Sequence, residues 1–190
     1  VAFYSDASNL VGGDSNAQPD VFVRLRGDGL TERISVSSDG TQGTGASVNP
    51  SISTDGRFVA FQSRASNLVL DDTNNAADIF VRDRLNNTTE RVCDRVQPNR
   101  FSFTPSISAD GRFVAFASAA TNLVPDDTNS HLDIFVCDRS TGDVERVSIG
   151  NLPGGGVVQG DGDSILPAIS GDGLVVGFKS LADNLVPNDA

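Results

Sequence analysis

The sequence predicts an all-β fold, and within that class a β-propeller built from four-stranded antiparallel blades. The first observation is a tandem repeat, because the segments VAFYS, VAFQS, VAFAS and VGFKS begin at positions 1, 59, 114 and 176. The second is constant spacing, since an Asn and an Asp eleven positions apart recur at 9 and 20, 67 and 78, and 122 and 133. The third is composition: short β-branched and aromatic stretches are separated by turn residues. A four-stranded unit repeated head to tail is typical of propeller blades.

The repeat predicts a single domain over residues 1–190, with units at approximately 1–58, 59–113 and 114–175 and a partial unit at 176–190. About three blades plus a partial one are therefore expected. Three blades do not close comfortably into a ring, and an open propeller leaves exposed strand edges. The missing blades come either from a longer natural protein, which is the interpretation we favour, or from a second chain that completes the ring.

Each full unit contains four predicted strands, and the second unit shows them in order. Asp55-Gly56 is expected to join the first two strands as a hairpin turn, because glycine tolerates the positive φ that such a turn requires. Asn86-Asn87 is expected to join the third strand to the fourth. No segment sustains the apolar period of a helix. The four predicted strands are Pro50–Ser53, Phe58–Ser63, Asp78–Asp83 and Thr89–Cys93.

The composition is acidic, with a formal net charge of −11, and almost all of the acidity comes from Asp. An acidic surface repels nucleic acid and anionic lipid headgroups, both of which require Lys-rich or Arg-rich surfaces. No apolar run is long enough to span a membrane as a helix. We therefore expect no nucleic-acid partner and no membrane insertion.

The loop between the second and third strands is rich in Asp and is the candidate binding site. Strand alternation places these loops on the same face as the variable-length connections between units, and the Asp-Gly turns on the opposite face. Loops held by a rigid scaffold commonly carry recognition. Each loop has an Asp-x-Asn-x-x-x-Asp pattern, whose oxygens are ligands that Ca²⁺ prefers, so Ca²⁺ is the candidate cofactor. The alternative is that the same side chains form Asx turns and cap backbone N–H groups. The candidate metal ligands are Asp14, Asn16, Asp20, Asp72, Asn74, Asp78, Asp127, Asn129 and Asp133.

Three further polar features have structural interpretations. The Glu-Arg pairs at 32–33, 90–91 and 145–146 are expected on the outermost strand, as a charged edge that discourages sheet association. Cys93 and Cys137 fall at different phases of the repeat, so two strand residues in unrelated blades are expected and not a disulfide. The glycine-rich stretch 154–163 is expected to be a flexible connection between blades.

Catalysis has little support in the sequence. His131 is the only histidine, and the other copies of its position carry Gln18 and Ala76. A Ser-His-Asp triad needs a nucleophile within reach of that histidine, and neither a GxSxG nor an HExxH motif is present. We therefore expect no catalytic residues.

The motif Ser-Ile-Ser-x-Asp-Gly-Arg-Phe-Val-Ala-Phe at 51–61 and 106–116, followed by Asp-Ile-Phe-Val-x-Asp at 78–83 and 133–138, resembles the repeats of the TolB-like superfamily of WD-repeat-like propellers. The resemblance covers nearly the whole chain. It implies a propeller fold and one of three settings: a binding scaffold in the bacterial envelope, an extracellular module of a larger protein, or a gating domain appended to a serine peptidase. It also implies a periplasmic, cell-surface or secreted location.

Two functional hypotheses follow. The first is a non-catalytic propeller module that presents its acidic loop face to a protein or carbohydrate ligand, with self-association as a further way to complete the ring. The alternative is a propeller piece of a larger, serine-peptidase-like hydrolase whose catalytic domain lies outside this sequence.

Overall fold

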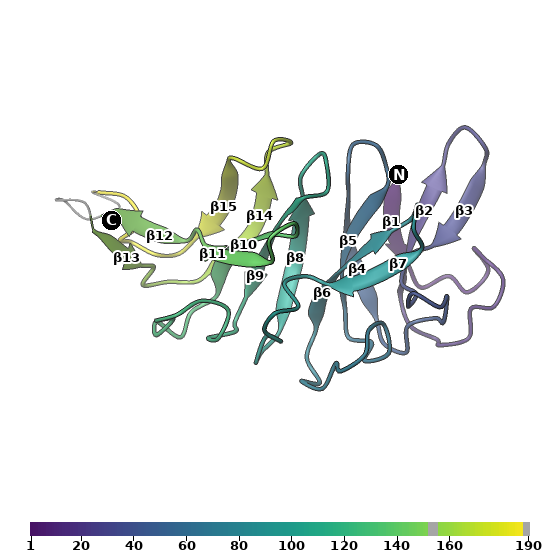
Figure 1. The fold of residues 1–190 in the computed structure, drawn as a ribbon, viewed down its shortest axis with the longest axis horizontal. Coiled ribbons are helices and arrows are strands. Elements are labelled where there is room, and N and C mark those ends of the chain that lie inside the picture. Colours follow the sequence, from purple (N-terminus) through teal and green to yellow (C-terminus); the bar gives the residue numbers. More distant parts are fainter. Residues whose placement is uncertain (152–155, 188–190) are drawn as a thin grey trace.

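The computed structural model describes residues 1–151 and 156–187, and in that part of the chain all regular secondary structure is β. The strands form a row of sheets along the long axis of the molecule (Figure 1). The sheets do not close into a ring. The strands are β1 (Ala2–Ser5), β2 (Asp20–Leu25), β3 (Leu30–Arg33), β4 (Ser47–Ile52), β5 (Phe58–Ser63), β6 (Asp78–Asp83), β7 (Thr88–Arg91), β8 (Ser102–Ile107), β9 (Phe113–Ser118), β10 (Asp133–Asp138), β11 (Asp143–Arg146), β12 (Ile149–Asn151), β13 (Val157–Gln159), β14 (Ser164–Ile169) and β15 (Val176–Ser180).

Two sheets are complete antiparallel blades, with the strand orders β4-β5-β6-β7 and β8-β9-β10-β11. We call them blade 2 and blade 3. Blade 1 consists of β1-β2-β3 and lacks the first strand of the pattern, whereas blade 4 consists of β14-β15 and has only the first two. A separate hairpin, β12-β13, lies between blades 3 and 4 in the chain. The all-β propeller prediction is therefore confirmed, as an open row of blades.

The strand predictions for the second unit hold closely. Phe58–Ser63 and Asp78–Asp83 have the predicted bounds, whereas the first strand begins earlier, at Ser47, and the fourth ends at Arg91. The first strand is longer because it carries a β-bulge just before its proline, with a register shift between Val48 and Ser51. The bulge recurs in β8 and β14, and a non-glycine residue adopts a positive φ in each copy. These residues are Asn49, Thr104 and Leu166.

The core lies between neighbouring blades, because the middle strands are buried on both faces. Within blades 1, 2 and 3 a phenylalanine of the second strand stacks on one of the third, as for Phe61 and Phe80 with ring centroids 5.9 Å apart. Phe116 and Phe135 repeat the pair at 6.0 Å. The strand interiors therefore read as continuous apolar runs, since neither face meets solvent.

Tight turns join the first strand to the second at one end of blades 2, 3 and 4. The turn glycines have positive φ, 74° at Gly56 and 76° at Gly111. A Cβ on Gly111 would lie 2.2 Å from the ring of Phe58 in the preceding blade. Glycine is therefore required there both by the turn and by the close approach of the next blade.

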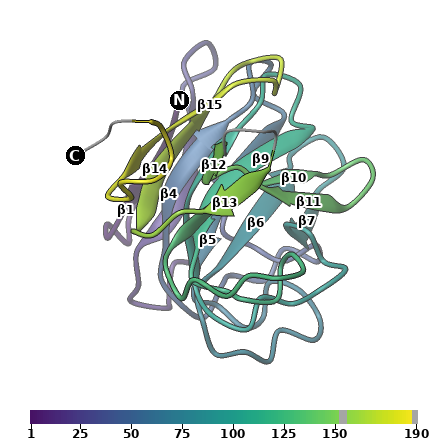
Figure 2. The same cartoon turned by 90° about the vertical axis from the view of Figure 1, so that its left-hand side faces the viewer.

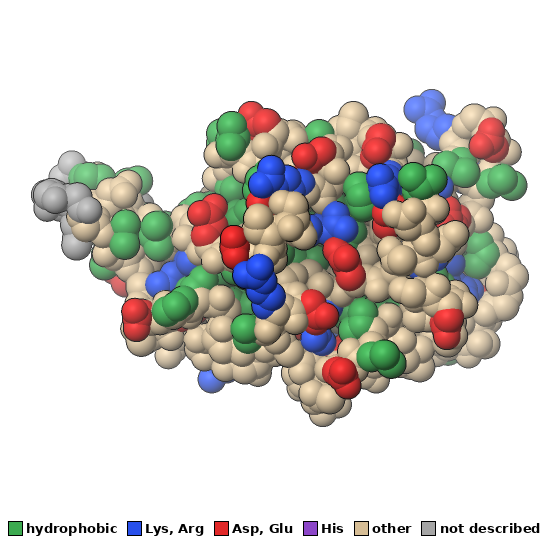
Figure 3. All heavy atoms as spheres, in the orientation of Figure 1, with side chains coloured by type: hydrophobic (Ala, Val, Ile, Leu, Met, Phe, Trp, Pro, Cys, Tyr) green, Lys and Arg blue, Asp and Glu red, His purple; other side chains and the backbone are tan. Residues whose placement is uncertain are grey.

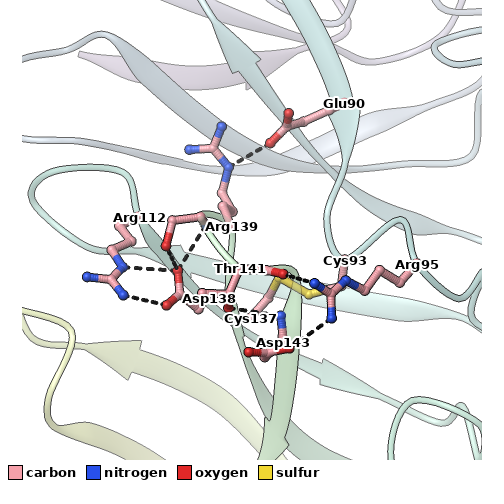
Figure 4. Close-up of a disulfide and its surroundings, with 10 residues drawn as sticks. Glu90, Cys93, Arg95, Arg112, Cys137, Asp138, Arg139, Thr141 and Asp143 are labelled. Carbon is pink, nitrogen blue, oxygen red and sulfur yellow. Dashed lines mark hydrogen bonds and ion pairs between the residues drawn. A yellow bond between two sulfur atoms is a disulfide. The ribbon is translucent and has the colours of Figure 1, made fainter.

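A disulfide joins Cys93 to Cys137, which corrects the expectation of two unrelated strand cysteines (Figure 4). Cys93 follows the outer strand β7 of blade 2, and Cys137 lies on β10 of blade 3, with Cα atoms 6.0 Å apart. The two repeat phases differ because the bond runs between blades. The equivalent position in blade 2 is Arg82, whose Nη1 donates to the backbone oxygen of Ser37 in blade 1 at 3.2 Å. The disulfide thus connects blades 2 and 3 at the place where hydrogen bonds connect blades 1 and 2.

The part of the chain that the structure describes contains no helix long and apolar enough to cross a membrane. Its surface carries acidic and basic side chains close together, as the space-filling view shows for one face (Figure 3). Ion pairs between neighbouring blades account for several of these groups.

Candidate binding face

The Asp-rich loops and the variable connections between blades lie at the same end of the molecule, as the strand alternation predicts. The loops between second and third strands extend together along the lower edge of Figure 1, and they again lie at the lower end in Figure 2. Direct contacts join them: Asn16 Nδ2 donates to the backbone oxygen of Gly43 at 2.9 Å. Asn74 and Asn129 make the equivalent bonds to Pro98 at 2.9 Å and Gly160 at 3.0 Å. Each Asp-rich loop is therefore fastened to the connection that follows its own blade.

The asparagine of each Asp-rich loop forms an Asx turn. Its Oδ1 accepts from the backbone N–H two residues later, at 2.9 Å for Asn16, 2.9 Å for Asn74 and 3.1 Å for Asn129. Its Nδ2 donates to the aspartate that begins the third strand, for example from Asn74 to Asp78 at 3.0 Å. Both polar atoms of the asparagine are thus engaged within the protein, as the Asx-turn alternative predicts.

A buried arginine lies against the aspartates of each loop, which the sequence reasoning missed. The exposed fractions of the side chains of Arg33, Arg91 and Arg146 are only 9%, 5% and 10%. Arg146 Nη1 lies 3.0 Å from Asp127 Oδ1 and 3.4 Å from Asp133 Oδ2.

The other two blades repeat this arrangement with longer distances. Arg33 lies 3.6 Å from Asp14 and 3.5 Å from Asp20, and Arg91 lies 3.9 Å from Asp72. The guanidinium groups supply positive charge to carboxylates whose own side chains are almost fully buried.

The prediction that the Glu-Arg pairs form a charged outer edge is therefore wrong for the arginines, because alternate residues of the fourth strand point to opposite faces. The glutamates point the other way, and two of them pair with the next blade. Glu32 accepts from Arg84 at 2.8 Å, and Glu90 accepts from Arg139 at 2.8 Å (Figure 4 shows the second pair). The arginines of these pairs thus contact the Asp-rich loop of their own blade, whereas Glu32 and Glu90 contact the next blade.

A glutamine in each connection between blades completes the loop network. Gln42 Nε2 donates to Asp14 at 2.9 Å and to Asp20 at 2.7 Å, and Gln97 Nε2 donates to Asp72 at 3.0 Å. The glutamines occur five positions before the serine that opens each first strand, at 42, 97 and 159. That spacing is constant although the connections differ in length, so it is a signal that the sequence alone contains.

The same glutamines also bind the following blade through their backbone oxygens. Asn67 Nδ2 donates to the oxygen of Gln42 at 2.9 Å, Asn122 to that of Gln97 at 2.9 Å, and Asn184 to that of Gln159 at 2.8 Å. The network therefore links one blade's Asp-rich loop to the next blade, and the loop face is held as a unit.

Burial raises the pKa of three carboxyls of the loop network. The pKa of Asp78 is raised to about 6, first by burial and then by the charge of Asp72. Burial also raises the pKa values of Asp72 and Asp127, against the charges of their arginines.

Blade 2 differs from its neighbours beside Asp78. Ser35 and Ser148 donate hydrogen bonds of 2.5 Å to the equivalent aspartates of blades 1 and 3. In blade 2 that serine position is Cys93, whose sulfur is in the disulfide and has no proton to donate.

The Ca²⁺ hypothesis gains no support from this geometry. Within residues 1–151 and 156–187, no group of three or more His, Cys, Asp or Glu side chains is arranged to hold a metal ion. The structure brings all nine candidate ligands into the loop networks, where arginine and glutamine already contact the carboxylates. Ca²⁺ binding stays a prediction.

A pocket of about 980 Å³ opens on this face, between the connection that follows blade 1 and the Asp-rich loop and outer strand of blade 2. Polar and apolar groups line it in comparable measure: the apolar side chains are Leu68, Val69 and Leu70, and the polar ones come from 37–39, 41, 66–67, 71–73, 89–91 and 94. Asp39 and Asp71 lie exposed at its edge. Hydrogen bonds from Ser37 and from the Thr41 backbone lower the pKa of Asp39 to about 2, so this carboxylate is ionised at neutral pH.

His131 lies in the Asp-rich loop of blade 3, where its Nδ1 is 3.2 Å from Asp163 Oδ1. Asp163 also accepts from the backbone N–H of Leu132 at 2.9 Å. The histidine thus has a place in the contact between a loop and the following connection. Residues 154 and 155 of the glycine-rich stretch lie outside the described residues. Gly160 and Gly162 pack closely on blade 4, where a Cβ on Gly162 would lie 2.5 Å from the oxygen of Leu181.

The repeated sheets and the loop face define the class of this chain: it is an open β-propeller. No family model matches the sequence, and no curated protein matches it. Solved structures do. TolB from Acinetobacter baumannii is 18% identical with a TM-score of 0.51, over 88% of this chain and 33% of that one. A putative TolB from Agrobacterium tumefaciens is 18% identical with a TM-score of 0.54, over 88% of this chain and 52% of that one.

The fold is therefore a TolB-like propeller, as the sequence motifs imply. The chain spans a third to a half of the length of these two TolB chains. A structure from a study of two prolyl endopeptidases is 18% identical over 87% of this chain and 23% of that one, with a TM-score of 0.49. Likeness at this level of identity concerns the fold alone, and the hydrolase alternative stays a prediction.

Proposed function

We propose that this chain is a non-catalytic propeller module whose Asp-rich loop face binds a protein ligand. The part of the ligand that it binds is a basic segment. The pocket between blades 1 and 2 carries the proposal, because it is a hollow of about 980 Å³ that opens among loops held by hydrogen bonds. Rigid loops lower the entropy cost of binding. A carbohydrate is the other ligand considered, since the lining also offers hydroxyl and amide groups.

Charge favours the protein ligand. The chain has a net charge of −11, and Asp39 and Asp71 are free of arginine partners among the described residues, unlike Asp72. Complementary charge accelerates encounter and selects partners of opposite sign. A ligand segment rich in Lys or Arg has the opposite sign, so the acidic face both attracts it and selects it.

The disulfide supports a location in an oxidising compartment, which is the periplasm, the cell surface or the exterior of the cell. Disulfides persist in such compartments and are rare in the reducing cytosol. The bond lies between two blades and contributes to the rigidity on which the proposed binding face depends.

The proposal is tested by measuring binding of a lysine decapeptide and of a neutral dextran to the immobilised chain. We expect saturable binding of the peptide that weakens with salt. The variant Asp39→Asn/Asp71→Asn should weaken it, whereas Asp28→Asn, which removes a charge from the exposed β2-β3 turn at the other end of the blade, should not. Equal effects of the two variants would overturn the assignment of the pocket, and dextran binding alone would favour the carbohydrate. Adding Ca²⁺ or a chelator to the same samples tests the metal hypothesis, because a bound ion raises the melting temperature.

A further inference from the structure

The outer edge of blade 2 is covered by the connection that precedes this blade. Ser38 Oγ accepts from the backbone N–H of Thr89 in β7 at 2.9 Å and donates to its backbone oxygen at 3.3 Å. Thr89 Oγ1 donates to the backbone oxygen of Val36 at 2.5 Å. A bridge between Val36 and Gln42 closes the covering turn. The backbone groups of Thr89 that point away from the sheet are therefore both satisfied.

The same position of blade 3 has no such cover. Val144 of β11 lies opposite Cys137 of β10, as Thr89 of β7 lies opposite Arg82 of β6. Because the hydrogen-bonding direction alternates along an antiparallel strand, the N–H and C=O of Val144 also point away from the blade. In residues 1–151 and 156–187 no protein group hydrogen-bonds to either of them. The outer edge of β11 thus offers a free donor and a free acceptor.

The length of the preceding connection explains this difference. It covers 13 positions, from 93 to 106, whereas the connection that reaches β7 covers 16, from 35 to 51. The shorter connection begins at the disulfide, and its Arg95 lies across the β10-β11 turn, where it donates to the backbone oxygen of Thr141 and to Asp143 at 2.9 Å (Figure 4). The connection and the strand both lie inside the described residues, so the open edge follows from their own lengths.

An apolar pocket lies beside the open edge. Its volume is about 160 Å³, and Val144, Val96, Leu123 and Cys93 contribute to its lining. Val144 packs on the core between blades 2 and 3, and Val96 is 44% exposed. Directly opposite residues of two antiparallel strands place their side chains on the same face. A residue placed opposite Val144 therefore has its side chain over this pocket.

Two acidic residues flank Val144 along the strand. Asp143 and Glu145 are exposed, and alternation places both on the opposite face from Val144. The position of Asp143 carries no carboxylate in blades 1 and 2. Its ion pair with Arg95 joins side chains that are 70% and 66% exposed, and such a pair contributes little to stability. Asp143 is therefore able to exchange this partner for the cation of a docked segment.

We propose that β11 is a docking edge for an extended segment of a partner protein, which adds a fifth antiparallel strand to blade 3. The segment has an apolar residue opposite Val144 and a basic residue on each side of it. The apolar residue exchanges two backbone hydrogen bonds with Val144 and covers the pocket. In strand addition the main-chain bonds supply affinity and the side-chain pockets supply specificity.

Charge disfavours a second copy of this chain as the occupant. Antiparallel pairing of two β11 strands would place acidic side chains opposite each other, and like charges in directly opposite positions are destabilising. A basic partner segment has opposite charges at the same positions. This inference does not depend on the proposed ligand of the Asp-rich loop face.

Fluorescence anisotropy of the full chain with the labelled heptapeptide Ser-Thr-Lys-Val-Lys-Thr-Ser tests the proposal. We expect saturable binding. Methylation of the valine nitrogen removes the donor to the backbone oxygen of Val144 and should raise the dissociation constant at least ~10-fold. Methylation of the backbone nitrogen of the following lysine is the matched control, because that N–H points away from β11 and its loss should change the dissociation constant little.

Variants of the chain test the pocket. Val96→Asp places a charge beside the docked apolar side chain and should also weaken binding at least ~10-fold, whereas Leu30→Asp, at an exposed position of blade 1, should not. Asp39→Asn/Asp71→Asn should bind the heptapeptide as the natural chain does, which separates this edge from the loop-face pocket. Thermal unfolding shows whether each variant is folded.

Four results would overturn the proposal: no saturable binding, equal losses from the two methylations, equal losses from Val96→Asp and Leu30→Asp, or loss of binding in the Asp39→Asn/Asp71→Asn variant. If Val96→Asp does not fold, the two methylated peptides still decide, because they leave the chain unchanged.

Discussion

Removal of the Cys93–Cys137 disulfide gives the most direct test of how the blades are held together. The bond joins residues separated by 44 positions, and both cysteines are buried. A loop of that length corresponds to about 4 kcal/mol of stabilisation by the loop-closure relation, because the bond restricts the unfolded chain. For a chain of this size each kcal/mol lowers the melting temperature by about 2–4 °C, so the loss is about 8–16 °C.

The residue that replaces Cys93 allows a second quantity to be measured, which is the free energy of a hydrogen bond to Asp78. Serine stands at the equivalent position in blades 1 and 3 and donates to the buried aspartate at 2.5 Å. Cys93→Ser/Cys137→Ala therefore loses the disulfide but gains a hydrogen bond to Asp78, which contributes about 1.5–3 kcal/mol when the acceptor is charged. Cys93→Ala/Cys137→Ala loses the disulfide without that gain. The serine variant should be the more stable of the two by about that amount, and both should be less stable than the natural chain.

Urea unfolding at neutral pH, followed by circular dichroism, measures all three free energies of unfolding. The natural chain in a reducing agent serves as a further comparison and should resemble the alanine variant. Equal stabilities of the oxidised and reduced chain would refute the role of the bond. Equal stabilities of the two double variants would refute the equivalence of position 93 with the serines of the neighbouring blades.

Three further predictions concern single side chains. The pKa of Asp78 is raised to about 6 from 3.8, so its contribution to stability is fully present below pH 3.8 and is lost as the pH rises through 6. Between pH 7 and pH 4 the natural chain should gain about 2–3 kcal/mol relative to Asp78→Asn, as measured by urea unfolding across that range. Arg91→Ala leaves the buried Asp72 without its cation and should cost about 3–5 kcal/mol in the same assay at pH 7. Gly111→Ala places a Cβ 2.2 Å from Phe58 at a φ of 76° and should lower stability by about 1–3 kcal/mol or more, as measured by thermal unfolding.

Matched variants at exposed positions show how much of each effect comes from the substitution itself and how much from the buried contact. Asp28→Asn removes an exposed carboxylate and should leave the pH dependence unchanged, and Arg64→Ala removes an exposed guanidinium. Gly13→Ala occurs at a φ of 73° with no atom within 4 Å of the new Cβ, so it reports the backbone cost alone. If Gly13→Ala costs as much as Gly111→Ala, the contact with Phe58 is not the cause. If Arg64→Ala lowers the stability as much as Arg91→Ala does, the buried ion pair is not the cause of the loss.

The sequence by itself determined the fold class, the repeat and the positions of the middle strands. Phe58–Ser63 and Asp78–Asp83 were predictable to the residue, because a buried strand is an apolar run bounded by turn residues that lie next to it in the chain. The hairpin turn at Gly56 was predictable for the same local reason. The constant distance from Gln42, Gln97 and Gln159 to the following serine was also present in the sequence, although its meaning depends on the loop that each glutamine meets.

Only the tertiary structure decided which polar residues are buried and which blades they join. Arg91 reads as a surface residue of an outer strand, and it is buried because a loop more than ten residues earlier folds over it. Cys93 and Cys137 meet because the end of the fourth strand of blade 2 packs on the third strand of blade 3, which brings different phases of the repeat together. Contacts between blades join residues far apart in the chain and leave no local pattern, so packing and not sequence periodicity determines them.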